Sequence, residues 1–203
     1  EALEKANVML KQATQMKYDI GIAIARYAIG DTYLNANMNN EAIEEYEIAM
    51  QKLHKVSDSE KLQEKVLIQL IPTLIRMGRM NKAKAYLDQM EQMNDYQHSR
   101  FIENIFQAYY YLHNNDMDKV RKYIQEAEEW YEYYPFYFHS SILKYIQAEY
   151  AKRIGDDELA IKLYNELTIN TSSANVYNRY LKMKNSLAQL YTKQNRPREA
   201  CAI

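Results

Sequence analysis

The residues that could do chemistry are dispersed along the chain and form no recognisable catalytic or metal-binding pattern. No two histidines have the four-residue spacing that places a zinc-binding pair on one helix face; they are His54, His98, His113 and His139. Neighbouring acids such as Asp156 and Asp157 point in different directions on a helix, which favours a solvated face or a helix start. No base stands near Cys201 in the sequence to activate it, so we expect a buried thiol. We therefore expect no enzyme activity and no catalytic, cofactor-binding or metal-binding residues.

The composition is that of an ordinary globular protein with balanced charge. Of 203 residues, 47% are apolar and 26% are charged, and the formal net charge is −1. This charge gives no global basic field to attract nucleic acid, so we expect no nucleic-acid partner. No run of about 18 apolar residues is present, so we expect no membrane span. The stretch 39–60 is acidic and the stretch 174–203 is basic, which fits either solvated faces or contacts between oppositely charged surfaces.

The elements that would position any functional residue are long helices. The chain has only four Gly and three Pro, and residues of high helix propensity are abundant. Pro72 falls inside one predicted helix, where we expect a kink rather than a break because the apolar spacing continues after it. The predicted helices cover residues 1–16, 19–36, 39–55, 59–78, 80–94, 97–114, 117–133, 137–155, 157–168, 174–194 and 197–203.

A pattern recurs at intervals of about 40 residues, which indicates a repeat architecture. Each copy has a small apolar residue early in a helix, and the five positions are Ala42, Ala83, Val120, Ala160 and Ala200. Five residues earlier stands a residue that tolerates a left-handed turn, at Asn37, Gly78, Asn115, Gly155 and Asn195. Each copy is therefore predicted to be a helical hairpin with a short turn.

The best-defined copy places Ala42, Tyr46 and Ala49 on one helix face. Small residues let the second helix of a hairpin approach the first closely, and a large ring beside them fills the wider part of the gap. We expect most of the chain's 20 tyrosines to serve this kind of packing. A dense aromatic run at 130–139 is either a ligand platform or filler between repeats.

The spacing resembles the tetratricopeptide repeat (TPR) family. The first full copy matches that family's pattern best, through Gly30, Tyr33, Ala42, Tyr46 and Ala49, whereas Ile71 and Pro72 make the second copy depart most. The long period is similar to that of bacterial regulators and kinesin light chains. The resemblance implies an all-α, right-handed α-solenoid of antiparallel hairpins over 1–203. Because both ends fall inside predicted helices, we expect a fragment of a longer protein. The solenoid's repeats would be 1–16 (partial), 23–56, 64–97, 101–134, 141–174 and 181–203 (partial).

By the same resemblance, the first helices of the hairpins line a concave groove that binds a partner. The groove residues so implied are Tyr27, Asp31, Asn35, Arg76, Tyr109, His113, Tyr145, Glu149, Arg153 and Gln189. We place the centre of binding in the copies from Tyr109 to Arg153. Glu149 and Arg153 also have the spacing of a simple intrahelical ion pair. The Lys and Asn with which chaperone-binding members hold a peptide carboxylate are replaced by tyrosine and an acid, which argues against that ligand.

The segment "IAIARYAIGDTYLNANMNNEAIEEYEIAM" resembles repeat regions of bacterial sensor histidine kinases and regulators. This resemblance implies a non-catalytic scaffold for a protein or peptide ligand, acting as a sensory or regulatory arm in bacterial signal transduction. The alternative is a free-standing cytoplasmic TPR adaptor for complex assembly. The compartment stays open, with a periplasmic or membrane-tethered position favoured over the cytoplasm. Self-association through uncapped ends is also expected, and either the groove or the convex face could bind.

Overall fold

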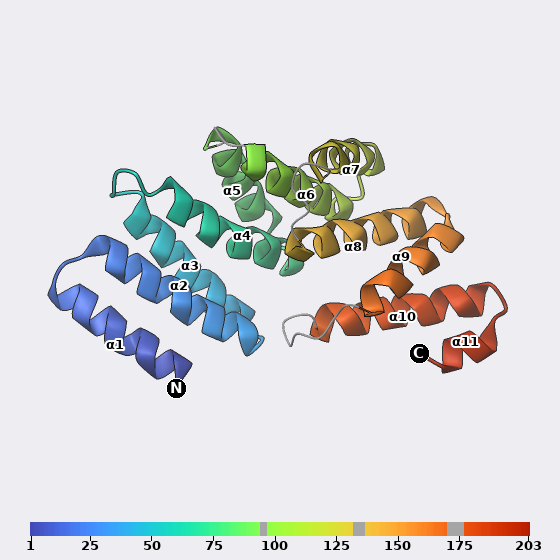
Figure 1. Cartoon of the computed structure of the whole chain (residues 1–203), viewed down its shortest axis with the longest axis horizontal. Helices are drawn as coiled ribbons and strands as arrows, with labels where there is room; N and C mark the ends of the chain where they lie inside the picture. Colours follow the sequence, from blue (N-terminus) through green and yellow to red (C-terminus); the bar gives the residue numbers. More distant parts are fainter. Residues whose placement is uncertain (94–96, 132–136, 170–176) are drawn as a thin grey trace. The chain divides into compact units, whose positions relative to one another are not determined.

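The computed structural model describes residues 1–93, 97–131, 137–169 and 177–203 (Figure 1). Within these ranges the chain is entirely helical between its turns, and no strand is present. The helices are α1 (Ala2–Gln15), α2 (Asp19–Asn35), α3 (Asn39–Leu53), α4 (Glu60–Arg76), α5 (Met80–Gln92), α6 (Gln97–His113), α7 (Met117–Tyr131), α8 (Tyr137–Ile154), α9 (Asp157–Ile169), α10 (Tyr177–Lys193) and α11 (Pro197–Cys201).

The predicted helices are confirmed one for one. Wherever the structure describes them, the observed ends lie within about two residues of the predicted ones, as expected where helices fray. α4 continues through Pro72, so the break considered as an alternative does not occur. The platform considered at 130–139 lies mostly outside the residues whose side chains the structure describes.

The chain divides into two compact units, an N-terminal unit, Glu1–Asp95, and a C-terminal unit, Tyr96–Ile203. In the N-terminal unit, each helix from α1 to α5 packs on the next along the chain. In the C-terminal unit, α6 packs on both α7 and α8, and α9 packs on both α8 and α10. The sequence predicts one continuous solenoid along the whole chain. The contacts within each unit do not test this continuity, so it stays a prediction.

Every hairpin turn uses one residue in the left-handed conformation. The five predicted positions are confirmed, with positive φ at Asn37 (62°), Gly78 (70°), Asn115 (59°), Gly155 (87°) and Asn195 (57°). In each turn the following residue donates its N–H to a carbonyl five residues back, for example Met38 to Tyr33 at 2.9 Å and Asp156 to Ala151 at 2.9 Å. This bond belongs to a Schellman motif, which satisfies carbonyls at the helix end. Lys17 makes the same turn between α1 and α2.

The residue after each left-handed position closes the turn with its N–H and accepts the first hydrogen bond of the next helix with its carbonyl. The carbonyl of Met38 accepts the N–H of Ala42 at 3.0 Å, and the carbonyl of Asp156 accepts that of Ala160 at 3.0 Å. The Asp156 side chain adds a bond from the Leu159 N–H at 3.1 Å, which caps α9. The small residue of each copy therefore lies on the first turn of its helix, close to the preceding helix.

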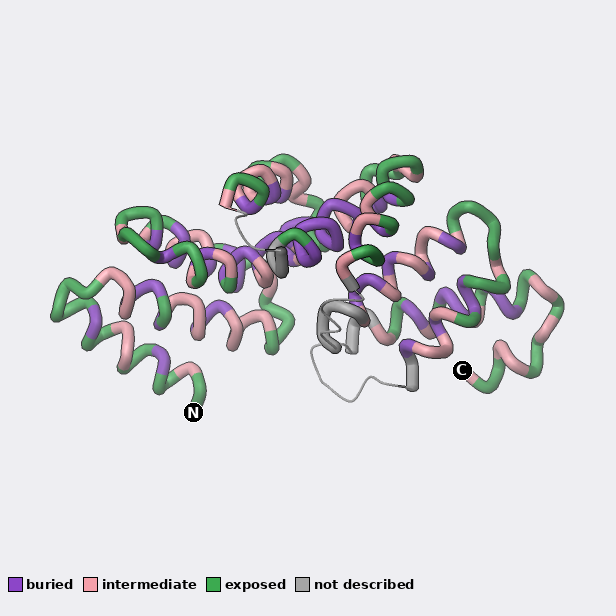
Figure 2. The backbone as a smooth tube through the Cα atoms, turned by 45° about the horizontal axis from the view of Figure 1, so that its top comes forward, coloured by how far each residue is buried: buried purple, intermediate pink, exposed green. Residues whose placement is uncertain are grey.

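The small–aromatic–small face is buried as predicted. Ala42, Tyr46 and Ala49 are all 0% exposed, and Figure 2 shows buried residues recurring along the helices as stripes. On the facing helix, a Cβ added to Gly30 would lie 2.6 Å from Cε1 of Tyr46. The glycine therefore makes room for the tyrosine ring.

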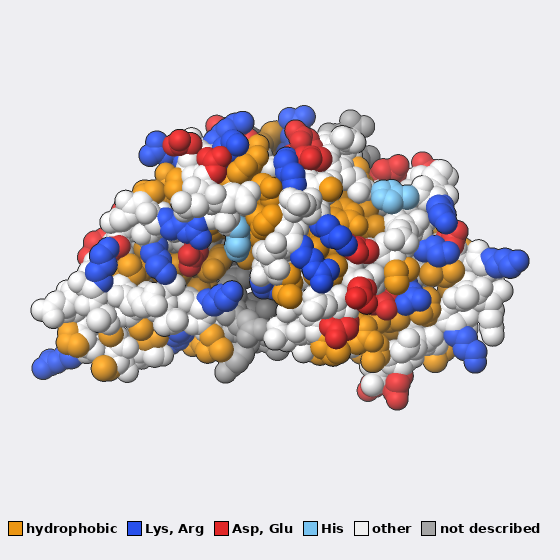
Figure 3. Space-filling model, turned by 180° about the vertical axis from the view of Figure 1, so that it is seen from behind, with side chains coloured by type: hydrophobic (Ala, Val, Ile, Leu, Met, Phe, Trp, Pro, Cys, Tyr) orange, Lys and Arg blue, Asp and Glu red, His pale blue; other side chains and the backbone are white. Residues whose placement is uncertain are grey.

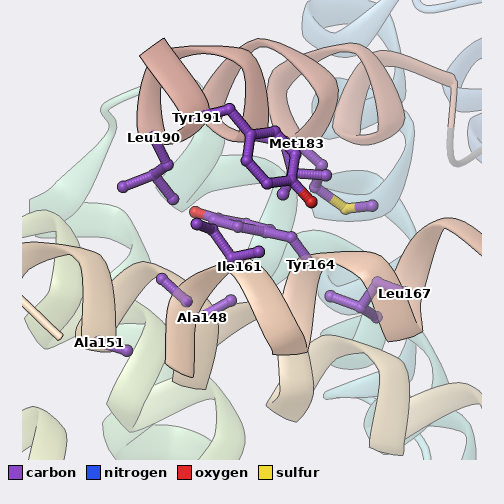
Figure 4. Close-up of a cluster of buried hydrophobic side chains, with 10 residues drawn as sticks. Ala148, Ala151, Ile161, Tyr164, Leu167, Met183, Leu190 and Tyr191 are labelled. Carbon is purple, nitrogen blue, oxygen red and sulfur yellow. The ribbon is translucent and has the colours of Figure 1, made fainter. Parts of the chain in front are cut away.

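In the C-terminal unit, Tyr164 occupies the position that Tyr46 has in the N-terminal unit. Its ring lies between α9 and side chains of α10, among them Met183 and Tyr191 (Figure 4). Ala148 on α8 and Ala160 on α9 are both 0% exposed beside it. The same packing rule therefore organises both units.

Cys201 is exposed, so the prediction of a buried thiol is wrong. The small residue before it, Ala200, is half-buried and packs against the core cluster beside α10. Successive helical residues point about 100° apart, so the next side chain turns outward.

We predict that Gly30→Ala destabilises the protein. The methyl group collides with the Tyr46 ring, and overpacking of this kind costs about 1–3 kcal/mol against a helix-propensity gain of about 1 kcal/mol. Chemical denaturation measures the loss. In a chain that also carries Tyr46→Leu, the Gly30→Ala change should cost less free energy of unfolding. If the free-energy losses of the two substitutions simply add in the double variant, the proposed clash is contradicted.

We also predict that Ala160→Leu lowers the unfolding free energy by about 1–3 kcal/mol, because the site is fully buried at a helix crossing. The matched control is Ala85→Leu on the exposed side of α5, which should change little. Equal thermal midpoints for Ala160→Leu and the unmodified chain would show that the crossing is not close-packed.

Candidate functional site

In the N-terminal unit, two predicted groove residues meet around a tyrosine hydroxyl. The Tyr46 hydroxyl donates to Oδ1 of Asp31 at 2.6 Å, and Tyr27 also hydrogen-bonds to Asp31. The Tyr27 and Tyr46 ring centroids are 5.9 Å apart with the rings tilted by 42°. Tyr46 is buried, whereas Tyr27 and Asp31 are half-buried on α2. We call Tyr27, Asp31 and Tyr46 the α2 cluster.

The surroundings of the α2 cluster keep its tyrosines neutral and make ionisation of the Asp31 carboxyl group less favourable. Burial raises the pKa of Asp31, and the hydrogen bonds from Tyr46 and Tyr27 oppose that shift only in part. Burial, followed by the charge of Asp31, raises the pKa of Tyr27 to about 12. Burial and the bond to Asp31 also raise the pKa of Tyr46. Both hydroxyls therefore act as neutral donors toward one half-buried carboxylate.

The other two predicted residues of this unit lie at helix ends. Asn35 is exposed at the end of α2. Arg76 is exposed at the end of α4, where its guanidinium donates to Oδ1 of Asn39 at 2.9 Å and to the Thr73 hydroxyl at 3.3 Å. Its charge acts on the Tyr46 hydroxyl, so α4 contributes to the surroundings of the α2 cluster.

The C-terminal unit repeats the arrangement. The Tyr164 hydroxyl donates to Oε1 of Glu149 at 2.5 Å, across the same separation of 15 residues as the Tyr46–Asp31 bond. Tyr145 stands four residues before Glu149, as Tyr27 stands before Asp31. Burial raises the pKa of Tyr164, and the charge of Glu149 adds to that shift. Glu149 therefore bonds to a tyrosine on α9, and the simple intrahelical pair with Arg153 is not the contact that forms.

Further hydrogen bonds link the first helices of the three hairpins in this unit, α6, α8 and α10. Arg153 of α8 donates to the carbonyl of Leu112 near the end of α6, where a cation is favoured by the helix dipole. On the other side, Lys152 donates to the Ser186 hydroxyl of α10 at 2.9 Å. Two neighbouring residues of α8 thus link it to both α6 and α10.

The charged groups on that face influence the pKa of His113. Its ring stands edge-on to Tyr109 with centroids 4.6 Å apart, and its Nδ1 lies 3.1 Å from the Tyr109 carbonyl. Burial lowers the pKa of His113 and that carbonyl bond opposes it, while the charges of Arg153 and Lys182 lower it and that of Glu149 raises it. The structure therefore brings together five predicted residues, Tyr109, His113, Tyr145, Glu149 and Arg153; with Lys182 they form what we call the α6/α8/α10 face.

Sequence reasoning missed the hydroxyl bonds and one cation of this site. Tyr46 and Tyr164 were assigned to packing alone, and Lys182 was not assigned a role. The signal for the bonds was present, because an acid precedes each of these tyrosines by 15 residues. Gln189, which was predicted, lies exposed on α10.

Charged side chains of both signs are mixed on one side of the molecule (Figure 3). On the side seen in Figure 3, Lys and Arg side chains alternate with Asp and Glu, and hydrophobic side chains lie between them. Within the described ranges, His, Cys, Asp and Glu do not gather in groups of three or more that could hold a metal ion. Each helix of the described chain is too short or too polar to cross a bilayer.

Comparison with known proteins gives a likeness of fold. No protein-family model matches the sequence, and no curated protein matches it. Among solved structures, the crystal structure of BtubC (BKLC) from P. vanneervenii is similar, with a TM-score of 0.67 and 12% sequence identity over 99% of this chain and 86% of that one. At this identity the likeness concerns the helical fold alone.

We predict that Asp31→Asn leaves the thermal midpoint at pH 7 unchanged or higher. A raised folded-state pKa means that stability is lost as pH rises above the unfolded value of 3.8, so the ionised carboxylate costs stability at pH 7. The amide oxygen still accepts the Tyr46 hydroxyl, and the difference between the two proteins should shrink below pH 3.8.

The control is Glu45→Gln, which removes the 2.8 Å ion pair with Arg26 and should lower the midpoint at pH 7. Thermal melts from pH 3 to pH 8 measure both effects. A large loss of stability in Asp31→Asn at pH 7 would show that the carboxylate charge stabilises the fold.

Proposed function

We propose that the protein is a non-catalytic scaffold that binds a protein or peptide through the first helices of its hairpins. The observation that carries this proposal is the α6/α8/α10 face, where half-buried tyrosines of α6 and α8 lie beside exposed cations of α8 and α10. Tyrosines supply contact area at a low cost in conformational entropy, and charged groups select the partner.

The fold part of the proposal is a TPR-like, right-handed α-solenoid. Its support is the repeated left-handed turn, the repeated small–aromatic–small packing and the likeness of fold to BtubC. In such arrays each repeat contacts its neighbours, and successive first helices form an extended binding surface. Contacts that link α6 to α8 and α8 to α10 are consistent with this arrangement.

The cellular role that we propose is a sensory or regulatory arm in a bacterial signalling protein, placed in the periplasm or tethered to a membrane. This role rests on the sequence resemblance described above. A cytoplasmic adaptor for complex assembly is the alternative, and it would use the same face.

The expected result of a peptide-display selection on the purified chain is a set of binders that compete with one another for the α6/α8/α10 face. Replacing Tyr109 and Lys182 together by Ala should weaken those binders about tenfold or more, as loss of a hot spot does. Calorimetric titration measures the affinities. We keep Arg153 unchanged in this test because it also holds the end of α6.

The matched control is Lys162→Ala, which removes an exposed charge from α9, the second helix of its hairpin. Its affinities should equal those of the unmodified chain. Binders that respond to Lys162→Ala but not to the double change would place binding on the second helices and contradict the proposal.

A further inference from the structure

Asp31 is a half-buried acid whose partners are tyrosine hydroxyls. Several other half-buried acids face a lysine or arginine, as in Arg26–Glu45 at 2.8 Å and Lys193–Asp157 at 2.5 Å. Partly exposed acids do the same, as in Lys144–Glu166 at 2.7 Å. Among the described residues, no ion pair accompanies the tyrosine hydroxyls that bond to Asp31.

An ionised carboxylate in this position carries a cost that a cation would remove. Burial of a charge is unfavourable unless an opposite charge or strong donors compensate it. The two hydroxyls donate to Asp31 but bring no charge. Arg76 of α4 donates to Asn39 and Thr73, and its charge also acts on the Tyr46 hydroxyl. A cation supplied by another molecule would form an ion pair in partly desolvated surroundings, where such pairs are strongest.

Tyr27 adds a second element of cation recognition. Its half-buried ring lies on the same face of α2 as Asp31, one helical turn away. Its raised pKa of about 12 keeps the hydroxyl protonated, so the ring carries no charge of its own at neutral pH. An ammonium or guanidinium group over an aromatic ring gains further attraction from the ring's electron density.

We infer that the α2 cluster is a binding site for a lysine or arginine side chain of the partner. The site consists of the Asp31 carboxylate, which forms the ion pair, and the Tyr27 ring, which covers the aliphatic stem or the cationic head. Tyr46 positions the carboxylate through its 2.6 Å hydrogen bond. This inference rests on the proposed function, because it names the chemistry that one part of the scaffold recognises.

The C-terminal unit provides an internal comparison. Glu149 has the same tyrosine partner and spacing, but Arg153 and Lys182 share its surroundings through their common influence on His113. Two cations thus act on the same face as Glu149, whereas one, Arg76, acts on the α2 cluster. A ligand cation is expected to prefer Asp31 over Glu149.

The experiment is an NMR titration of the full chain with a capped Gly-Gly-Arg-Gly-Gly peptide. Its analogues with citrulline or Glu in place of Arg keep the length but remove or invert the charge. We expect the Arg peptide to shift the Tyr27 and Asp31 signals and to lower the Asp31 pKa, which carboxyl ¹³C signals report without any substitution. Asp31→Asn and the citrulline analogue should each weaken binding about tenfold, and combining them should weaken it little further.

Glu44→Gln, which removes an exposed acid from α3 of the same unit, is the matched control and should bind the Arg peptide as the unmodified chain does. Equal binding of the Arg and citrulline peptides, an unchanged Asp31 pKa at saturation, or equal weakening by Glu44→Gln would each overturn the inference. If displayed binders depend on the α6/α8/α10 face while the Arg peptide leaves Asp31 unaffected, the scaffold proposal stands and the cation site alone fails.

Discussion

The left-handed residue between the two helices of each hairpin is the constraint on which the rest of the structure depends. Because it closes a Schellman motif and leaves the next residue as the N-cap of the following helix, the connection between the two helices is only a few residues long. Such a short link leaves little freedom in where the second helix begins. It therefore determines that the small residue five positions later meets the first helix, and that the large side chain four residues further on, such as Tyr46 or Tyr164, reaches back to it.

The two tyrosine–acid pairs show how packing and surface chemistry are combined. A buried hydroxyl requires an acceptor, and Asp31 and Glu149 supply one from the first helix. An acid that serves a buried hydroxyl must stand at the edge of the core, where its charge remains accessible. The core of the hairpin thus fixes the position of a carboxylate on the face that we propose for binding, and the neighbouring cations decide what each carboxylate can attract.

Much of this fold could be predicted because its determinants are local. Glycine and asparagine at Gly78 and Asn115 indicated the turns, and Ala42 with Tyr46 indicated the buried face, since helix periodicity relates these positions directly. The partners of charged groups were harder to predict. Arg153 has Glu149 one turn away, yet it bonds to a carbonyl of another helix, because tertiary packing brings the end of α6 closer to its guanidinium. The orientation of Cys201 likewise depends on which side of α11 meets α10.

The tyrosine–acid bond has a consequence for how a chain of similar hairpins avoids pairing its helices wrongly. Repeats of similar length and identical turns could exchange partners during folding at little cost in apolar burial. At the register of Asp31, however, α4 carries Pro72, which offers Tyr46 no side-chain acceptor. Pairing with α4 in that register would bury an unsatisfied Tyr46 hydroxyl, at a cost of about 1–3 kcal/mol. The hydroxyl thus favours α2 over α4 as its partner in this register, and it contributes to folding fidelity as well as to stability.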